Sequence, residues 1–169
     1  MKVHEVMTKE ISCCGPGTNA AAAGELIRTR NCGALMVIEG EGRLVGIVTE
    51  RDLFIVLGTN DRNRADLPVR ALMQNQIPTC SPEDDIRTAL EAMAQHRVQR
   101  LPVVDSAGAL KGVLSLDNIM LCAGADGVSI DDVLNAIKTI WGREVDPKTG
   151  AQTPAPLRSK LSDFRDANA

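Results

Sequence analysis

The sequence predicts a mixed α/β (α+β) fold made of two β-α-β-β-α repeats, followed by a C-terminal helix and a polar tail. Three observations predict it. The chain matches itself without a gap at an offset of 66 residues. Each copy holds two short apolar runs joined by a turn, and helix-start signals precede its helical stretches. Because each copy has only about 50 residues, we expect the two copies to pack their sheets together.

The repeat is an internal duplication in which residues 11–53 align with residues 77–119. Many of the remaining pairs exchange one aliphatic residue for another. The identical pairs include Met7 and Met73, Ile11 and Ile77, Cys14 and Cys80, Pro16 and Pro82, Leu35 and Leu101, Gly42 and Gly108, and Gly46 and Gly112. The two copies should therefore share one structure.

Each copy has the same order of expected elements. The expected elements are extended pieces at 11–13 and 77–80, helices at about 18–30 and 82–96, strand pairs at 34–38 with 43–48 and at 101–104 with 110–114, and last helices opening at Thr49 and Ser115. Glycine-containing turns at 39–42 and 105–108 are typical of hairpins. In the second copy, Ser81 followed by Pro82 and two acids predicts a helix with Ser81 as its N-cap.

The expected domain boundaries follow from the repeat and from changes in composition. They are a first repeat at 1–60, a polar linker at 61–66, a second repeat at 67–122, a C-terminal helix at 123–143 and a polar tail at 144–169. Within the expected C-terminal helix, Ser129 caps an amphipathic stretch with acids in its first turn.

Composition and charge exclude several classes of protein. Hydrophobic residues make up 44% and charged residues 24%, which are values of a globular chain. The net charge of −3 and the absence of Tyr argue against a nucleic-acid partner. No run of 18 apolar residues is present and the amino terminus carries charges, so we expect a cytoplasmic protein with no membrane partner.

Four motifs of the repeats match those of a known family. They are VMT at Val6–Thr8, GIVTERD at Gly46–Asp52, LPVVD at Leu101–Asp105 and GVLSLDN at Gly112–Asn118. Over about 3–122 the chain resembles a tandem pair of CBS domains, or Bateman module, of the stand-alone bacterial type. The resemblance implies a pseudo-two-fold unit with two clefts for adenosine-containing ligands. It also implies a regulatory protein and not an enzyme.

The resemblance points to Thr49 and Asp52 as ligand-binding residues of the first copy. Thr49 stands at an expected helix N-cap, where free N–H groups favour a phosphate. Asp52 lies one turn further and can accept hydrogen bonds from a ribose diol. The same Thr-x-x-Asp spacing is close to a capping box, which stabilises a helix without any ligand.

Two residues of the second copy complete this expected site. By the resemblance, Arg100 contacts a phosphate and the backbone of Ile77 meets the adenine edge, in the cleft that also holds Thr49 and Asp52. The alternatives are a solvated or ion-paired Arg100 and an Ile77 in the ordinary core. His96 is interpreted as a charge at a helix C-terminus.

The other cleft should be weaker or empty. It would combine Ser115 and Asn118 with Ala34, which takes the place of Arg100 in the first copy. Asn118 replaces the carboxylate with an uncharged amide, and neither Gly33 nor Ala34 can hold a phosphate. We therefore expect one competent site and one weak one.

The sequence leaves the ligand, the partner and two alternatives open. AMP, ADP and ATP fit the motif best, followed by NAD and S-adenosylmethionine, and no cofactor or metal is required. We expect a homodimer that relays ligand binding to an unknown protein partner. The apolar residues at Val56, Leu57, Ile119 and Leu121 would form the dimer face or else close the monomer core.

One alternative is a dimeric interaction scaffold that needs no ligand. The other is a Cys-based redox or metal sensor in which Cys13, Cys14, Cys80 and His4 converge. With His4 and His96 as the chain's two histidines, no catalytic triad or Cys–His pair can be argued, so no enzyme is expected.

Overall fold

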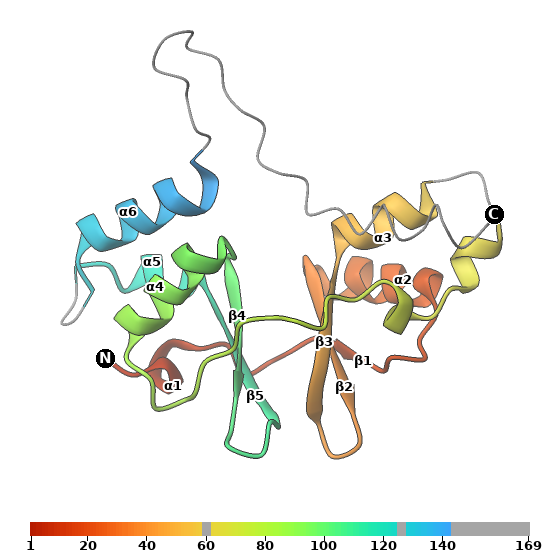
Figure 1. Ribbon diagram of the computed structural model, residues 1–169, viewed down its shortest axis with the longest axis horizontal. Coiled ribbons are helices and arrows are strands. Elements are labelled where there is room, and N and C mark those ends of the chain that lie inside the picture. The colour runs from red at the N-terminus through yellow and green to blue at the C-terminus, as the bar shows by residue number, and fades with distance from the viewer. Residues whose placement is uncertain (59–61, 125–127, 143–169) are drawn as a thin grey trace, which may run out of the picture.

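The computed structural model describes residues 1–58, 62–124 and 128–142. Figure 1 shows two lobes side by side, each with a strand pair and helices packed above it. The first repeat contains β1 (Cys13–Cys14), α2 (Ala20–Arg30), β2 (Ala34–Glu39), β3 (Arg43–Thr49) and α3 (Glu50–Leu57). The second contains α4 (Ile86–His96), β4 (Arg100–Val104), β5 (Leu110–Ser115) and α5 (Leu116–Leu121). The predicted α+β class and its two repeats are confirmed.

The strands form two small sheets, and the antiparallel pairs in the two sheets have equivalent registers. In the first sheet the order is β1-β2-β3, with β1 parallel and β3 antiparallel to β2. In the second sheet β4 pairs antiparallel with β5. Val37 opposite Gly46 matches Val103 opposite Gly112, and an irregularity follows both positions. Both predicted hairpins are therefore confirmed.

The leading extended pieces are shorter than predicted. The piece expected at 11–13 pairs only from Cys13 to Cys14, and the piece expected at 77–80 makes a single parallel bridge from Cys80 to Val103. Both copies thus place a cysteine beside the middle of the central strand.

The predicted start of the second-copy helix is wrong. Ser81 begins a turn, in which its N–H donates to Asp84 Oδ2 at 2.8 Å and the Asp84 N–H donates to the Ser81 carbonyl at 3.1 Å. The helix α4 starts at Ile86, because the extended Asp85 accepts a hydrogen bond from the Arg87 N–H at 2.9 Å. Its repeat mate Asn19 caps α2 in the same way, so that helix starts at Ala20 rather than 18.

The segment that leads each repeat packs into the other repeat. Val3 of α1 (Val3–Val6) is fully buried in the core of the second repeat, whereas Val69 of the 3-10 helix η2 (Val69–Ala71) is buried in the core of the first. Thr8 pairs with Val113 of β5, and its repeat mate Gln74 pairs with Ile47 of β3. This exchange is what a pseudo-two-fold arrangement requires, and it joins the repeats into one unit.

Gly46 and Gly112 permit this crossing. A β-carbon on Gly46 would lie 2.6 Å from Met73 Sδ, and one on Gly112 would lie 2.5 Å from Met7 Sδ. Both distances are far below van der Waals contact. Glycine is therefore needed where the leading segment crosses the last strand.

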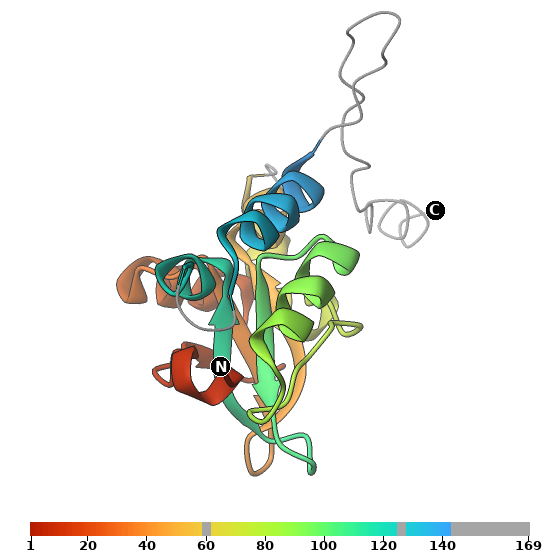
Figure 2. The same ribbon diagram turned by 90° about the vertical axis from the view of Figure 1, so that its left-hand side faces the viewer.

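Two predicted segments outside the repeats can be compared with the structure. The residues 62–66 of the expected linker form the 3-10 helix η1 (Arg62–Asp66), so this part of the connector is helical and contacts α2 and α3. The predicted C-terminal helix is α6 (Ile130–Trp141), capped by Ser129, and it lies beside α4 (Figure 2). The expected tail at 144–169 lies outside the described residues.

The predicted dimer face divides into buried and exposed side chains. Val56 is 6% and Ile119 0% exposed, so these two close the monomer core. Leu57 is 40% and Leu121 87% exposed. In the parts of the chain that are described, every helix is too short or too polar to cross a membrane.

Candidate functional site

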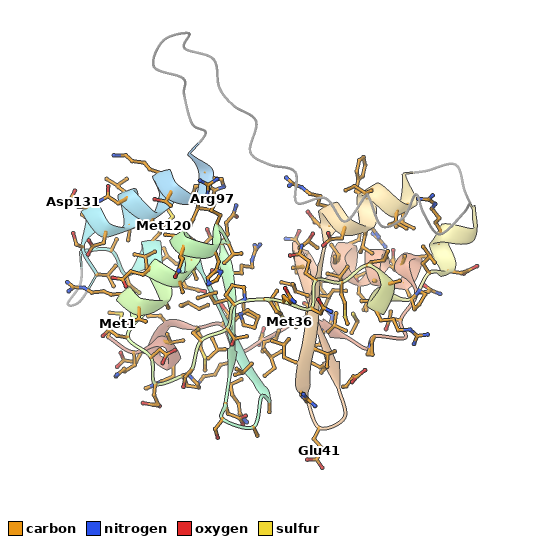
Figure 3. All side chains as sticks on the ribbon, in the orientation of Figure 1. Met1, Met36, Glu41, Arg97, Met120 and Asp131 are labelled. Atoms are coloured by element: carbon orange, nitrogen blue, oxygen red, sulfur yellow. The ribbon has the colours of Figure 1, made fainter. Side chains whose placement is uncertain are left out.

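A cleft of about 260 Å³ lies between the two repeats. It is lined by the leading segment around Thr8 and Ile11, by the stretch from Asn31 to Met36, and by Arg100, Ser115 and Asn118 of the second repeat. Figure 3 shows Met36 between the two strand pairs. We call this space the Asn118 cleft. It joins Ser115 and Asn118 with Ala34, as predicted for the second site. Arg100, which was expected in the cleft of Thr49 and Asp52, lines this cleft, because it begins β4 opposite Ser115.

Ser115 and Asn118 form a reciprocal cap at the start of α5. The Ser115 N–H and hydroxyl donate to Asn118 Oδ1 at 2.9 and 2.8 Å, and the Asn118 N–H donates to Ser115 Oγ at 3.2 Å. The amide nitrogen Nδ2 of Asn118 donates to Thr8 Oγ1 at 3.4 Å. Asn118 therefore ties the leading segment to the second repeat at the wall of the cleft.

Thr49 and Asp52 form the same cap at the start of α3. The Thr49 N–H and hydroxyl donate to Asp52 Oδ2 at 2.9 and 2.6 Å, and the Asp52 N–H donates to Thr49 Oγ1 at 3.3 Å. The capping-box interpretation is thus confirmed. Among the described residues, Asp52 Oδ1 has no hydrogen-bond donor. One carboxylate oxygen holds the helix while the other stays open as an acceptor.

Arg100 reaches across the boundary between the repeats. It begins β4 opposite Ser115, and a β-carbon on Gly33 would lie 3.7 Å from Arg100 Nη1 and 3.8 Å from Nη2. Its side chain is exposed, and its guanidinium makes no ion pair or hydrogen bond within the described residues. Because Gly33 has no side chain, it leaves space at the cleft for the Arg100 guanidinium.

The repeat offset defines the position of a counterpart, which we call the Asp52 cleft. The residues equivalent to Ser115, Asn118 and Ile11 at the 66-residue offset are Thr49, Asp52 and Ile77. The same shift exchanges Ala34 with Arg100, so Arg100, which lines the observed cleft, is also the position expected to line the counterpart. All four predicted ligand-binding residues, Thr49, Asp52, Ile77 and Arg100, thus stand at positions equivalent to the observed lining. Their contact with a ligand stays a prediction.

The described residues contain no cysteine cluster of the kind that a metal sensor needs. Burial raises the pKa of the Cys14 thiol to about 11 and that of Cys80 to about 12, so both remain neutral at physiological pH. His4 Nδ1 lies 3.0 Å from the Pro82 carbonyl oxygen. Within the described ranges no three His, Cys, Asp or Glu residues are placed to hold a metal ion.

Sequence reasoning missed several lining residues. Thr8 entered the sequence analysis only as the last residue of the VMT motif, and Gly33 only as a residue that cannot hold a phosphate. Glu10, Asn31 and Cys32 were not considered as lining residues. Their repeat mates flank Ile77 and Arg100 along the chain. The repeat offset was therefore the signal that could have found them.

The comparisons with known proteins agree with this architecture. A sequence model of the CBS domain matches residues 3–58 and again 69–123. The CBS domain-containing protein YhcV of Bacillus subtilis is 32% identical over 118 residues, which cover 69% of this chain and 81% of that protein. The chain therefore belongs to the CBS domain family and carries two CBS domains in tandem.

Two further relatives bear on function. A crystal structure of CBSX2 in complex with AMP has a TM-score of 0.64 and 26% identity, covering 72% of this chain and 94% of that one. Inosine-5'-monophosphate dehydrogenase of Methanocaldococcus jannaschii is 32% identical over 120 residues, which cover 70% of this chain but only 23% of that enzyme. The similarity to the enzyme is confined to its CBS domains.

Proposed function

We propose that this CBS pair is a regulatory module, without catalytic activity, that binds an adenosine-containing nucleotide between its two repeats. The observation that carries the proposal is Asp52, whose Oδ1 is an open acceptor at the start of α3 while Oδ2 completes the cap. A ribose diol needs such an acceptor, and the free guanidinium of Arg100 can take the phosphate. AMP, ADP and ATP are the expected ligands, ahead of NAD and S-adenosylmethionine.

Three further features support this assignment. Ile77 is half-buried between the bridged residues Gln74 and Cys80, and its backbone is the expected contact for the adenine edge. The relative CBSX2, which shares the fold and 26% identity, was crystallised with AMP. The observed cleft is lined by residues of both repeats, so a ligand bound between the repeats would contact both and bias their relative geometry.

We propose that the protein is a homodimer in the cytoplasm and that ligand binding changes how this dimer acts on a partner protein. Phe54 is 76% exposed on α3, and Leu121 is 87% exposed on α5. Ile55 and Leu121 are repeat mates, so both helices present apolar side chains at equivalent places. The same faces would serve a ligand-independent scaffold, which is the second candidate function.

Thermal unfolding against a panel of adenosyl ligands tests the proposal. A ligand at about 100 times its dissociation constant stabilises the fold by about 2.7 kcal/mol. For a chain of this size the midpoint should rise by roughly 5–10 °C. We expect Asp52→Ala to abolish the rise and Asn118→Ala to retain it.

The other outcomes are informative. A rise that is lost in Asn118→Ala but kept in Asp52→Ala would place the nucleotide in the Asn118 cleft. The absence of any shift across the panel would contradict nucleotide binding and leave the scaffold. In that case an oligomer that persists without ligand, measured by light scattering, is the expected result.

A further inference from the structure

The helix α6 has a second apolar face that the described part of the chain leaves uncovered. Figure 1 shows α6 as the outermost helix of the second repeat. Val133 and Ala136 are buried in the second core, where α6 packs on α4. Ile130, Leu134 and Trp141, in contrast, are 58%, 47% and 51% exposed. The helix therefore uses only part of its apolar surface to hold the fold.

The uncovered residues of α6 have the spacing of a coiled-coil seam. The row consists of Ile130, Leu134, Ile137 and Trp141. Its members are separated by four, three and four residues, which is the alternation of the d and a positions of a heptad. Ile137 is half-buried and joins the row to the residues that face the core. A row with this period fits a second row of the same kind, because the side chains of each helix enter the spaces between those of the other.

Charged residues beside this row favour an antiparallel copy of the same helix. Asp131 lies at the outer end of α6 (Figure 3), and Lys138 follows it about two turns later on the same side. Both are exposed, and within the described ranges neither has an ion-pair partner. When two α6 helices pack in opposite directions, Asp131 of each lies beside Lys138 of the other. This arrangement forms two equivalent ion pairs.

The other helices with exposed apolar residues are less suited to pair with themselves. The helix α3 has 8 residues and α5 has 6, so each is shorter than the 12-residue α6. Both carry acids in the first turn and no base in the last. Neither helix is therefore complementary in charge to an antiparallel copy of itself. The faces with Phe54 and Leu121 then remain available for the partner protein.

We propose that α6 is the dimer helix of this protein and that it pairs antiparallel with α6 of a second copy. In this contact Trp141 of each chain packs against Ile130 of the other, and Leu134 of each chain packs against Ile137 of the other. Tryptophan is among the residues that contribute most to the stability of an interface. The inference rests on the homodimer of the proposed function and names its interface, which lies outside the two CBS domains. It does not depend on the nucleotide.

Sedimentation equilibrium of the full chain without ligand tests the proposal. Asp131→Lys and Lys138→Asp each bring like charges together, so each variant alone should dissociate at least about tenfold more readily than the wild type. An equimolar mixture of the two variants should form dimers again, because a chain with two lysines then faces a chain with two aspartates. A mixture that stays monomeric would contradict the antiparallel pair.

Asp132→Lys is the matched control for the charge reversal. Asp132 is also an acid of the first turn, but it lies about 100° further round the helix than Asp131, away from the row. The variant should therefore dimerise like the wild type. Unchanged dimers in both Asp131→Lys and Lys138→Asp would overturn the α6 interface and leave the homodimer to another face. A monomeric wild type would overturn the homodimer as well, while nucleotide binding is tested separately by thermal unfolding.

Discussion

Asp52 and Asn118 do the same structural work with different chemistry. Each accepts two hydrogen bonds through one side-chain oxygen and closes the cap of its helix. The remaining atom of Asp52 is an acceptor, whereas the remaining atom of Asn118 is a donor that reaches Thr8. Because an amide suffices for the cap, the carboxylate of Asp52 is available for a function beyond folding.

Arg100→Ala should separate recognition of phosphate from recognition of adenosine. Charge-assisted hydrogen bonds contribute about 1.5–3 kcal/mol, so we expect AMP to bind about ten- to a hundredfold more weakly. Adenosine, which has no phosphate, should bind as before. Calorimetry with both ligands measures the split.

Arg28→Ala is the control, because Arg28 pairs with Glu25 on the exposed face of α2. It should leave both affinities unchanged. An equal loss of AMP and adenosine binding in Arg100→Ala would show that Arg100 shapes the cleft instead of binding phosphate.

At this scale the caps were predictable and the place of Arg100 was not. A Thr or Ser followed by an acid or amide three residues later is a local pattern, and the structure confirms both N-caps, Thr49 and Ser115. The approach of Arg100 to Gly33 joins two residues far apart in the sequence. No local sequence pattern indicates that the glycine at position 33 leaves room for the side chain of Arg100.

The secondary-structure elements agree with the prediction where a single sequence feature determines them. The hairpin turns were predicted because glycine marks them, and Gly42 and Gly108 adopt φ of 91° and 79°. The start of α4 was missed because two helix-start signals overlap. Ser81 with Pro82 looks like a start, but the cap is made by Asp85, and comparison with Asn19 in the first copy would have indicated this.

Gly46→Ala and Gly112→Ala should destabilise the protein by similar amounts. Each added β-carbon meets a methionine sulfur of the crossing segment, at 2.6 and 2.5 Å. Overpacking of this kind costs about 1–3 kcal/mol of the free energy of unfolding. Urea unfolding measures the change.

Gly17→Ala provides the comparison, because a β-carbon there meets nothing within 4 Å. It should leave stability nearly unchanged. If Gly46→Ala and Gly17→Ala unfold at the same urea concentration, the close crossing of the leading segment is not present in solution.

The whole molecule is held together by the exchange of leading segments. The offset revealed the repeat, including the matching Met7 and Met73, but it could not tell which core either methionine completes. A leading segment has the same hydrophobic pattern whether it packs against its own repeat or against the other repeat. The structure shows that Met7 packs against the second core and Met73 against the first.

Val3→Ala should weaken the second repeat although Val3 precedes the first. Val3 is fully buried beside residues of α4 and β5, and removing its methyl groups costs about 2 kcal/mol of the free energy of unfolding. Hydrogen exchange should therefore rise in α4 more than in α2. Faster exchange confined to α2 would contradict the exchanged arrangement.

The central claim is that Asp52 binds an adenosine-containing ligand as well as capping α3. The most direct measurement is the calorimetric affinity of AMP for the wild type and for Asp52→Asn. Asn118 shows that the amide preserves the cap, so the variant should unfold at nearly the wild-type temperature. We predict an AMP affinity at least about tenfold weaker in Asp52→Asn. Equal affinities in two equally stable proteins would contradict the account.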